Sequence, residues 1–64
     1  MCLSTVYNKN RNDDSILMEN VMMVECENDK VILTDLFGKR LEITGCLVKA
    51  SLTDGYVIVN SPEQ

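Results

Sequence analysis

Cys2 follows the initiator methionine, where its side chain and the chain terminus can bind one metal ion together. A second residue this small permits removal of Met1, which leaves an α-amine and a thiolate able to close a five-membered chelate. If Met1 stays, the amine, the backbone amide nitrogen and the thiol can still converge. Nitrogen and sulfur donors suit late divalent transition metals. Cys2 is therefore the candidate metal ligand; the alternative is a start-site cysteine without a role.

One chain supplies only half of a four-coordinate site from Cys2. A two-fold homodimer that joins two N-termini would supply two nitrogens and two sulfurs from identical residues. This donor set suits a square-planar nickel(II) or copper(II) ion better than magnesium or calcium. Copper(II) has the higher intrinsic affinity and would bind in vitro, so selection of nickel would depend on metal availability.

The other two cysteines, Cys26 and Cys46, are expected in the core. Cys26 lies on the same side of its strand as Met22 and Val24, and Cys46 begins an apolar stretch. Free cysteine is among the most buried residue types. An odd number of cysteines without a C-x-x-C spacing favours reduced thiols and a cytoplasmic protein. Neither a secretory signal nor an apolar run of ~20 residues is present, so no membrane association is expected.

Catalytic chemistry has little support in this composition. The chain contains no histidine, which removes the usual acid–base and triad arrangements. It also lacks the glycine-rich loops that bind nucleotide phosphates. Asp13, Asp14 and Asp35 lie in polar turn segments and are most simply solvated carboxylates. We therefore predict that the protein is not an enzyme.

The charge balance disfavours nucleic acid as a partner. Six basic residues oppose ten acidic ones, giving a net charge of −4, whereas phosphate binding requires lysine and arginine to displace counterions. Lys9 with Arg11, and Lys39 with Arg40, form short basic pairs rather than a stripe. A small basic face stays open as an alternative.

The pattern of apolar and turn residues predicts short strands. We expect strands over residues 2–7, 16–27, 31–34, 40–44, 47–52 and 56–59. Gly38 and the Asp54-Gly55 pair are typical of tight turns. A helical turn near residues 16–20 is the alternative, because Leu17, Val21 and Val24 also fit a helical stripe. The β-branched residues on both sides favour strand.

The predicted fold class is all-β: a small antiparallel β-barrel of five to six short strands. Residues 1–60 would form a single domain and residues 61–64 a frayed tail. Curling a short meander into a barrel removes exposed edges, with bends expected at Glu19-Asn20 and at Gly45. A domain of this size is marginal alone, and any edge left open is a place for a second subunit.

Three segments resemble the CooT family of small nickel-binding proteins, named for a carbon monoxide dehydrogenase accessory protein. They are Met-Cys-Leu-Ser-Thr-Val-Tyr at 1–7, Met-Glu-Asn-Val at 18–21 and Val-Ile-Leu-Thr-Asp-Leu-Phe-Gly at 31–38. The similarity extends over about residues 1–60. It implies an Sm-like barrel, a homodimer, and nickel bound through Cys2. Carbon monoxide dehydrogenase is the partner implied, although a family member can serve another nickel enzyme or none.

Two functions of different classes follow. The first is a homodimeric accessory protein that holds one nickel between two Cys2 residues and delivers or stores it. The second is an Sm-like RNA-binding or protein-interaction module without metal, since members of the family have also been labelled as RNA-binding. The acidic charge and the few aromatic residues favour the first, because single-stranded nucleic acid needs a basic groove with stacking side chains.

Overall fold

The computed structural model describes residues 3–62. Within this range the chain forms six strands and one 3₁₀ turn, so the all-β prediction is confirmed. The elements are β1 (Ser4–Asn8), η1 (Asp13–Ser15), β2 (Ile16–Glu27), β3 (Lys30–Asp35), β4 (Arg40–Thr44), β5 (Cys46–Ser51) and β6 (Tyr56–Asn60). The one helical turn precedes residue 16, and β2 is strand throughout, as the β-branched residues favoured. No helix long and apolar enough to cross a membrane occurs in the described range.

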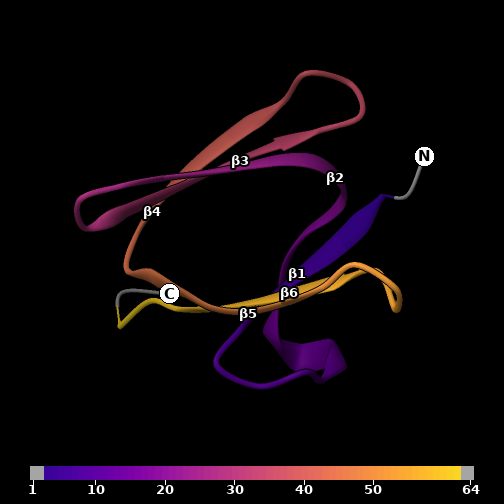
Figure 1. Cartoon of the computed structure of the whole chain (residues 1–64), viewed down its shortest axis with the longest axis horizontal. Helices are drawn as coiled ribbons and strands as arrows, with labels where there is room; N and C mark the ends of the chain where they lie inside the picture. The colour runs from indigo at the N-terminus through magenta and orange to yellow at the C-terminus, as the bar shows by residue number, and fades with distance from the viewer. Residues whose placement is uncertain (1–2, 63–64) are drawn as a thin grey trace.

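The strands form one sheet in the order β4-β3-β2-β1-β6-β5. The sheet folds over so that β3, β4 and the C-terminal half of β2 lie opposite β5 and β6 (Figure 1). Neighbouring strands are antiparallel except β1 and β6, which run parallel with Val6 opposite Val57. The prediction of a purely antiparallel sheet is therefore wrong for the β1–β6 pair. Between residues 3 and 62 no ladder joins β4 to β5, so the sheet is open and closure into a barrel is not confirmed.

β2 is the strand that links the two layers, and it bends twice. Ser4 pairs with Val21 whereas Val6 pairs with Met18, so the register with β1 shifts across Glu19 and Asn20. Asn20 has φ +57, a left-handed conformation that asparagine tolerates better than most residues. The bend predicted at Glu19-Asn20 is thus confirmed, and it turns β2 from one layer into the other. A second shift against β3 falls between Val21 and Met23.

The core is small and aliphatic. Its most buried side chains come from five of the strands and meet between the layers: Val6, Val21, Val31, Leu33, Ile43 and Val59. Burying each such side chain contributes about 1.5–3 kcal/mol. Valine, leucine and isoleucine fill the core because the chain has only two tyrosines, one phenylalanine and no tryptophan.

Ser61, just after β6, is held against the end of β1. Asn8 Oδ1 accepts a hydrogen bond from the Ser61 backbone N–H at 2.9 Å, and Asn8 Nδ2 donates to the Ser61 carbonyl at 3.1 Å. Ser61 is fully buried, although the sequence places it at the start of a frayed tail. Its burial follows from the parallel β1–β6 pair, which carries the end of β6 past Asn8. The boundaries 1–60 and 61–64 stay a prediction.

A sharp corner joins β4 to β5 at Gly45. Its backbone has φ +150, and its N–H donates to the Asp29 carbonyl at 2.6 Å. A Cβ atom here would meet the backbone of Asn60 and Ser61. The bend predicted at Gly45 is confirmed. Only glycine, which has no Cβ atom, can occupy this corner so close to the backbone at the end of β6.

Candidate functional site

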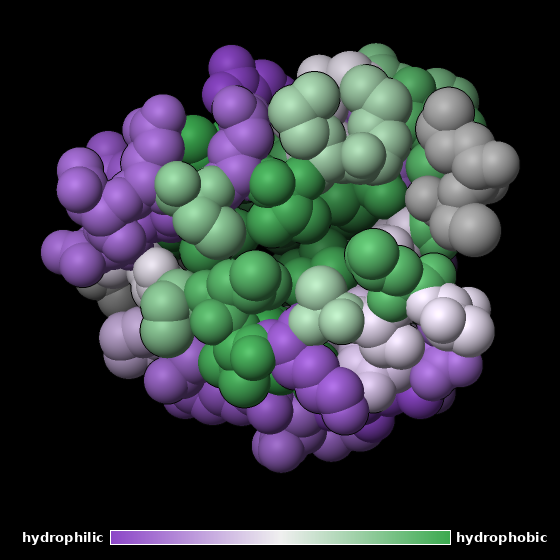
Figure 2. All heavy atoms as spheres, in the orientation of Figure 1, coloured by the Kyte–Doolittle hydropathy of each residue, from purple (hydrophilic) through white to green (hydrophobic). Residues whose placement is uncertain are grey.

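An apolar groove of about 280 Å³ opens between the two layers on the side where the sheet is not closed. Figure 2 shows hydrophobic side chains gathered across the middle of this face, with hydrophilic ones at its left and lower margins. The lining comes from β1, β2, β5, the β5–β6 turn and β6: Ser4, Val21, Met22, Met23, Val24, Cys26, Leu47, Ala50, Leu52 and Val57. No acidic or basic side chain is among them.

The groove exists because the edge strands β4 and β5 do not meet. Leu47 and Ala50 pair with the core residues Val59 and Val57, so they lie on the inward face of the edge strand β5. Among residues 3–62 no strand covers them, and Leu47 remains 42% exposed. Leu52, in the turn after β5, is 77% exposed. In a closed barrel these side chains would be core; here they form one wall of an open hollow.

The chain enters the fold at the rim of this groove. Ser4, the first residue of β1, contributes to the lining. The Thr5 N–H donates to the Gly55 carbonyl at 3.0 Å, which ties the start of β1 to the β5–β6 turn. Cys2, the predicted metal ligand, lies outside the described residues and is not tested by the structure. Covalent geometry limits the distance between its Cα and that of Ser4 to about 7.6 Å.

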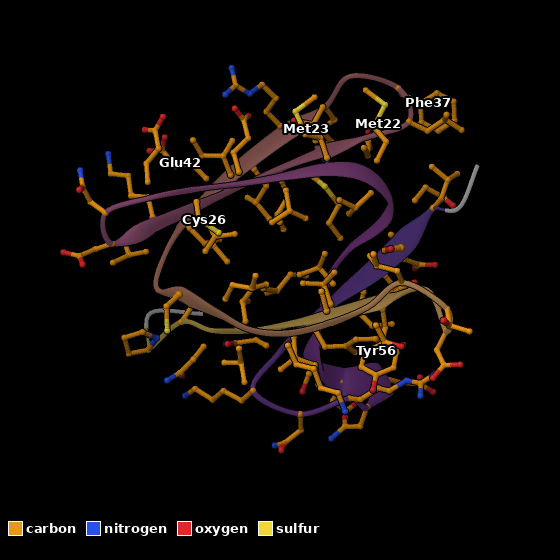
Figure 3. The ribbon with its side chains drawn as sticks, in the orientation of Figure 1. Met22, Met23, Cys26, Phe37, Glu42 and Tyr56 are labelled. Atoms are coloured by element: carbon orange, nitrogen blue, oxygen red, sulfur yellow. The ribbon has the colours of Figure 1, made fainter. Side chains whose placement is uncertain are left out.

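Cys26 and Cys46 are both free and exposed, so the prediction that they lie in the core is wrong. Cys26 does point into the space between the layers (Figure 3), but it lies in the open groove rather than beneath another strand. Cys46 begins the uncovered edge strand β5. The reasons differ: Cys26 faces inward where the sheet is open, whereas Cys46 pairs with the exposed Asn60 and so lies on the outer face of β5.

The acidic residues considered in the sequence do not form a metal site. Asp35 Oδ1 accepts backbone hydrogen bonds from Phe37 and Lys39, at 2.9 and 2.8 Å, which is a turn-stabilising role. Asp13 and Asp14 form the exposed η1 turn. Across residues 3–62, no group of three or more cysteine, aspartate or glutamate side chains could hold a metal ion. A complete donor set would need ligands from beyond this range or from a second chain.

The paired charges lie away from the groove. Lys30 contacts Glu42 at 3.5 Å and Arg40 contacts Glu25 at 3.9 Å, across the β2–β3–β4 face. All four side chains are about half exposed, and Figure 3 places Glu42 on this side of the molecule. Such surface pairs contribute at most about 1 kcal/mol. Their main effect is to keep the charges of this layer on its outer face.

Comparison with known proteins places the chain in a family. The sequence profile described as CO dehydrogenase accessory protein CooT matches residues 1–60. The chain belongs to the CooT family. An uncharacterized protein of Methanocaldococcus jannaschii is 36% identical over 59 residues, covering 92% of this chain and 96% of the relative. The resemblance seen in the sequence is thereby confirmed.

A solved structure supports the fold of this CooT-family chain. A crystal structure of a protein assigned as CooT from Carboxydothermus hydrogenoformans superposes with a TM-score of 0.80. The superposition covers 94% of this chain and 97% of the other at 18% sequence identity. At that identity the likeness concerns the fold alone.

One cluster in this CooT-family member was missed from the sequence. Arg11 lies over the Tyr56 ring with its Cζ 4.2 Å from the centroid, and Lys49 Nζ lies 5.7 Å away. Tyr7 meets the same ring edge-on, with centroids 6.5 Å apart. The parallel β1–β6 pair brings Tyr7 and Arg11 to Tyr56, and the antiparallel β5–β6 ladder brings Lys49. The sequence gives no local signal that Tyr7 and Arg11 meet Tyr56, because nothing in it indicates the parallel pairing.

The groove was not predicted from the sequence either, although one feature of β5 indicates it. β5 has apolar residues on both faces, at Leu47, Val48 and Ala50, while an edge strand that faces water on one side should alternate. Continuous apolar character in a short strand is equally typical of a fully buried strand. Strand order decides between the two, and the sequence does not reveal that β5 is an edge.

Proposed function

We propose that this protein is an accessory protein that holds one nickel(II) ion between two copies through Cys2 of each. Nickel is its cargo, delivered to or stored for a nickel enzyme. The observation that carries the proposal is the position of the chain start: Ser4 lies in the rim of a groove without charged residues, two residues from Cys2. The family description supports the recipient, because CO dehydrogenase is a nickel enzyme.

The donor chemistry fits this cargo better than a hard cation. Cys2 offers a thiolate together with terminal or backbone nitrogen, which suits nickel(II) and, in vitro, copper(II). Residues 3–62 contain no cluster able to replace it. Two copies would complete four donors with one symmetric contact. Nothing in this arrangement requires a catalytic group, so we propose a binding protein and not an enzyme.

The setting we propose is the cytoplasm. Cys26 and Cys46 are free and exposed, a state that a reducing compartment maintains. The recipient we propose is carbon monoxide dehydrogenase or another nickel enzyme. Transfer from a site at Cys2 would need no unfolding of the sheet, since Cys2 precedes β1 in the sequence.

The test is a nickel titration of metal-free protein followed by ultraviolet–visible absorption. We expect thiolate-to-nickel charge-transfer bands that saturate at one nickel per two chains, and no bands in Cys2→Ser. Cys26→Ser and Cys46→Ser are the matched controls and should titrate as the wild type does. Mass spectrometry of each sample fixes the state of Met1. Bands that persist in Cys2→Ser, or wild type without bands, would contradict the proposal.

The second candidate is the metal-independent RNA-binding or protein-interaction module. The Tyr56 cluster favours it, because two cations and a second aromatic ring gather on one outer face. Its RNA form requires an affinity that falls steeply with salt and is lost in Arg11→Ser. We rank it second because Tyr56 itself is 8% exposed, which leaves little ring surface for a base to stack on.

A further inference from the structure

We propose that the outer face of β1, β5 and β6, around Tyr56, binds an acidic segment of a partner protein. Carboxylates of that segment would pair with Arg11 and Lys49. The inference goes beyond the proposed function, because nickel binding through Cys2 does not require this face. Successive side chains of a strand point to opposite faces, so Tyr56 points away from the groove that Val57 lines. Figure 3 shows Tyr56 on the far side of the β5–β6 layer from Cys26.

Two cationic side chains converge on one aromatic ring. Arg11 Cζ lies 4.2 Å from the centroid of the Tyr56 ring, and Lys49 Nζ lies 5.7 Å from it. The two charges are therefore within about 10 Å of each other, roughly the screening length at ~0.1 M salt, so they repel. The ring attracts both cations and offsets part of this repulsion. Carboxylates bound beside the two cations would offset more of it.

Neither cation has a carboxylate partner in the described part of the chain. The ion pairs of residues 3–62 are Lys30 with Glu42 and Arg40 with Glu25. The side chains of Arg11 and Lys49 contact only the Tyr56 ring among their interactions in this range. The chain holds ten acidic residues against six basic ones, so carboxylates are not scarce. Their placement leaves these two cations unpaired.

Acidic residues are absent from the three strands of this layer. β1, β5 and β6 contain no aspartate or glutamate, and Lys49 is their only charged residue. The adjoining turns hold Asp13, Asp14 and Asp54. The strands thus present positive charge on a chain whose net charge is −4. Such a face favours an anionic partner, because complementary charge steers the encounter and fixes its orientation.

Arg11 can bind a carboxylate without leaving the Tyr56 ring. A guanidinium that lies over an aromatic ring keeps its N–H donors at the edge of its own plane, where they match the two oxygens of a carboxylate. Tyr7 meets the Tyr56 ring edge-on, with centroids 6.5 Å apart, and so supports the ring from the neighbouring strand. The ring therefore positions the guanidinium while its donors stay available.

A protein segment fits this face better than a nucleic acid or a small molecule. Tyr56 is 8% exposed, which leaves little ring surface for a base to stack on, and a long polyanion is repelled by the acidic remainder of the chain. Small-molecule sites enclose most of their ligand in a pocket, whereas Arg11 and Lys49 are exposed. A short acidic segment needs only the two cations.

The experiment is a titration of the metal-free, isotope-labelled full chain with hexaglutamate at low ionic strength, followed by NMR chemical shifts. We expect shifts centred on the amides of Lys49 and Tyr56. The dissociation constant should rise at least about threefold in Lys49→Gln and at least about tenfold in the double variant Arg11→Gln/Lys49→Gln. Circular dichroism checks folding, and Lys49→Gln alone decides if the double variant is unfolded.

Lys39→Gln is the matched control. Lys39 is also exposed and lies directly before β4, in the other layer, so its replacement removes the same charge from a different place. Its dissociation constant for hexaglutamate should stay within about twofold of the wild-type value. Equal weakening in Lys39→Gln and Lys49→Gln, or a wild type without shifts at this face, would overturn the inference.

Two further samples separate this inference from the other proposals. Hexauridylate is the competing probe: if it binds this face more tightly than hexaglutamate, the occupant is a nucleic acid and the inference is wrong. Cys2→Ser should bind hexaglutamate as the wild type does, because the face does not use the thiol. A wild type that binds nickel through Cys2 but does not bind hexaglutamate would overturn this inference and leave the nickel proposal standing.

Discussion

Gly45 shows how one residue sets the shape of the open sheet. Its φ of +150 and the closeness of the Asn60 and Ser61 backbone leave no room for a Cβ atom. In Gly45→Ala we expect a loss of about 3 kcal/mol or more in the free energy of unfolding, from backbone strain and the steric clash together. Urea unfolding followed by circular dichroism measures it.

Gly38 is the control for this prediction. It also has positive φ, +86, but nothing lies within 4 Å of the position its Cβ would take. Gly38→Ala should therefore lower the free energy of unfolding only by the cost of the left-handed backbone conformation, about 1–2 kcal/mol. Equal losses in the two variants would mean that the contact with Asn60 and Ser61 relaxes freely and does not fix the corner.

At the residue scale, Met22 shows why the alternation of apolar residues along β2 does not predict which side chains reach the core. The sequence puts Met22, Val24 and Cys26 on one side of the strand, and Val24 and Cys26 do share a side. The register shift between Val21 and Met23 interrupts the alternation at Met22, so Val21 is the residue that reaches the core. A bulge moves side chains across the strand without changing composition, so periodicity alone does not reveal it.

At the scale of elements, the β3–β4 turn is stabilised by a single carboxylate. Asp35 Oδ1 accepts from the backbone N–H groups of Phe37 and Lys39. We expect Asp35→Ala to lower the free energy of unfolding by about 1–2 kcal/mol and to speed hydrogen exchange at these two amides. Asp35→Asn keeps the acceptor oxygen and should restore more than half of the loss. Unchanged exchange in Asp35→Ala would contradict this role.

The strands themselves were largely predictable. Alternation located β4 at the predicted residues 40–44, and Asp54-Gly55 marked the β5–β6 hairpin. The parallel pairing of β1 with β6 was not predictable, because it joins segments about fifty residues apart and no turn signal links them. That pairing decides which strands are edges, and therefore where the sheet stays open.

At the scale of the whole molecule, bound nickel should raise the free energy of unfolding. A ligand that binds only the native state stabilises it by about 2.7 kcal/mol at a hundred times its Kd, which for a domain of this size raises Tm by about 10 °C or more. We expect that rise in the wild type with nickel(II), less than about 2 °C in Cys2→Ser, and none with magnesium. Calorimetry of metal-free protein with and without added metal measures it. A similar rise in Cys2→Ser would place the metal at other residues.

The sequence by itself determined the elements and the candidate ligand. Local rules suffice for these: alternation gives strands, glycine and aspartate give turns, and Cys2 joins a thiol to the chain terminus. The tertiary structure decided what is exposed. Whether Cys26 and Leu47 are core or surface depends on whether β4 meets β5, and that is set by packing among distant strands. The groove is therefore a property of the fold, although each of its residues is visible in the sequence.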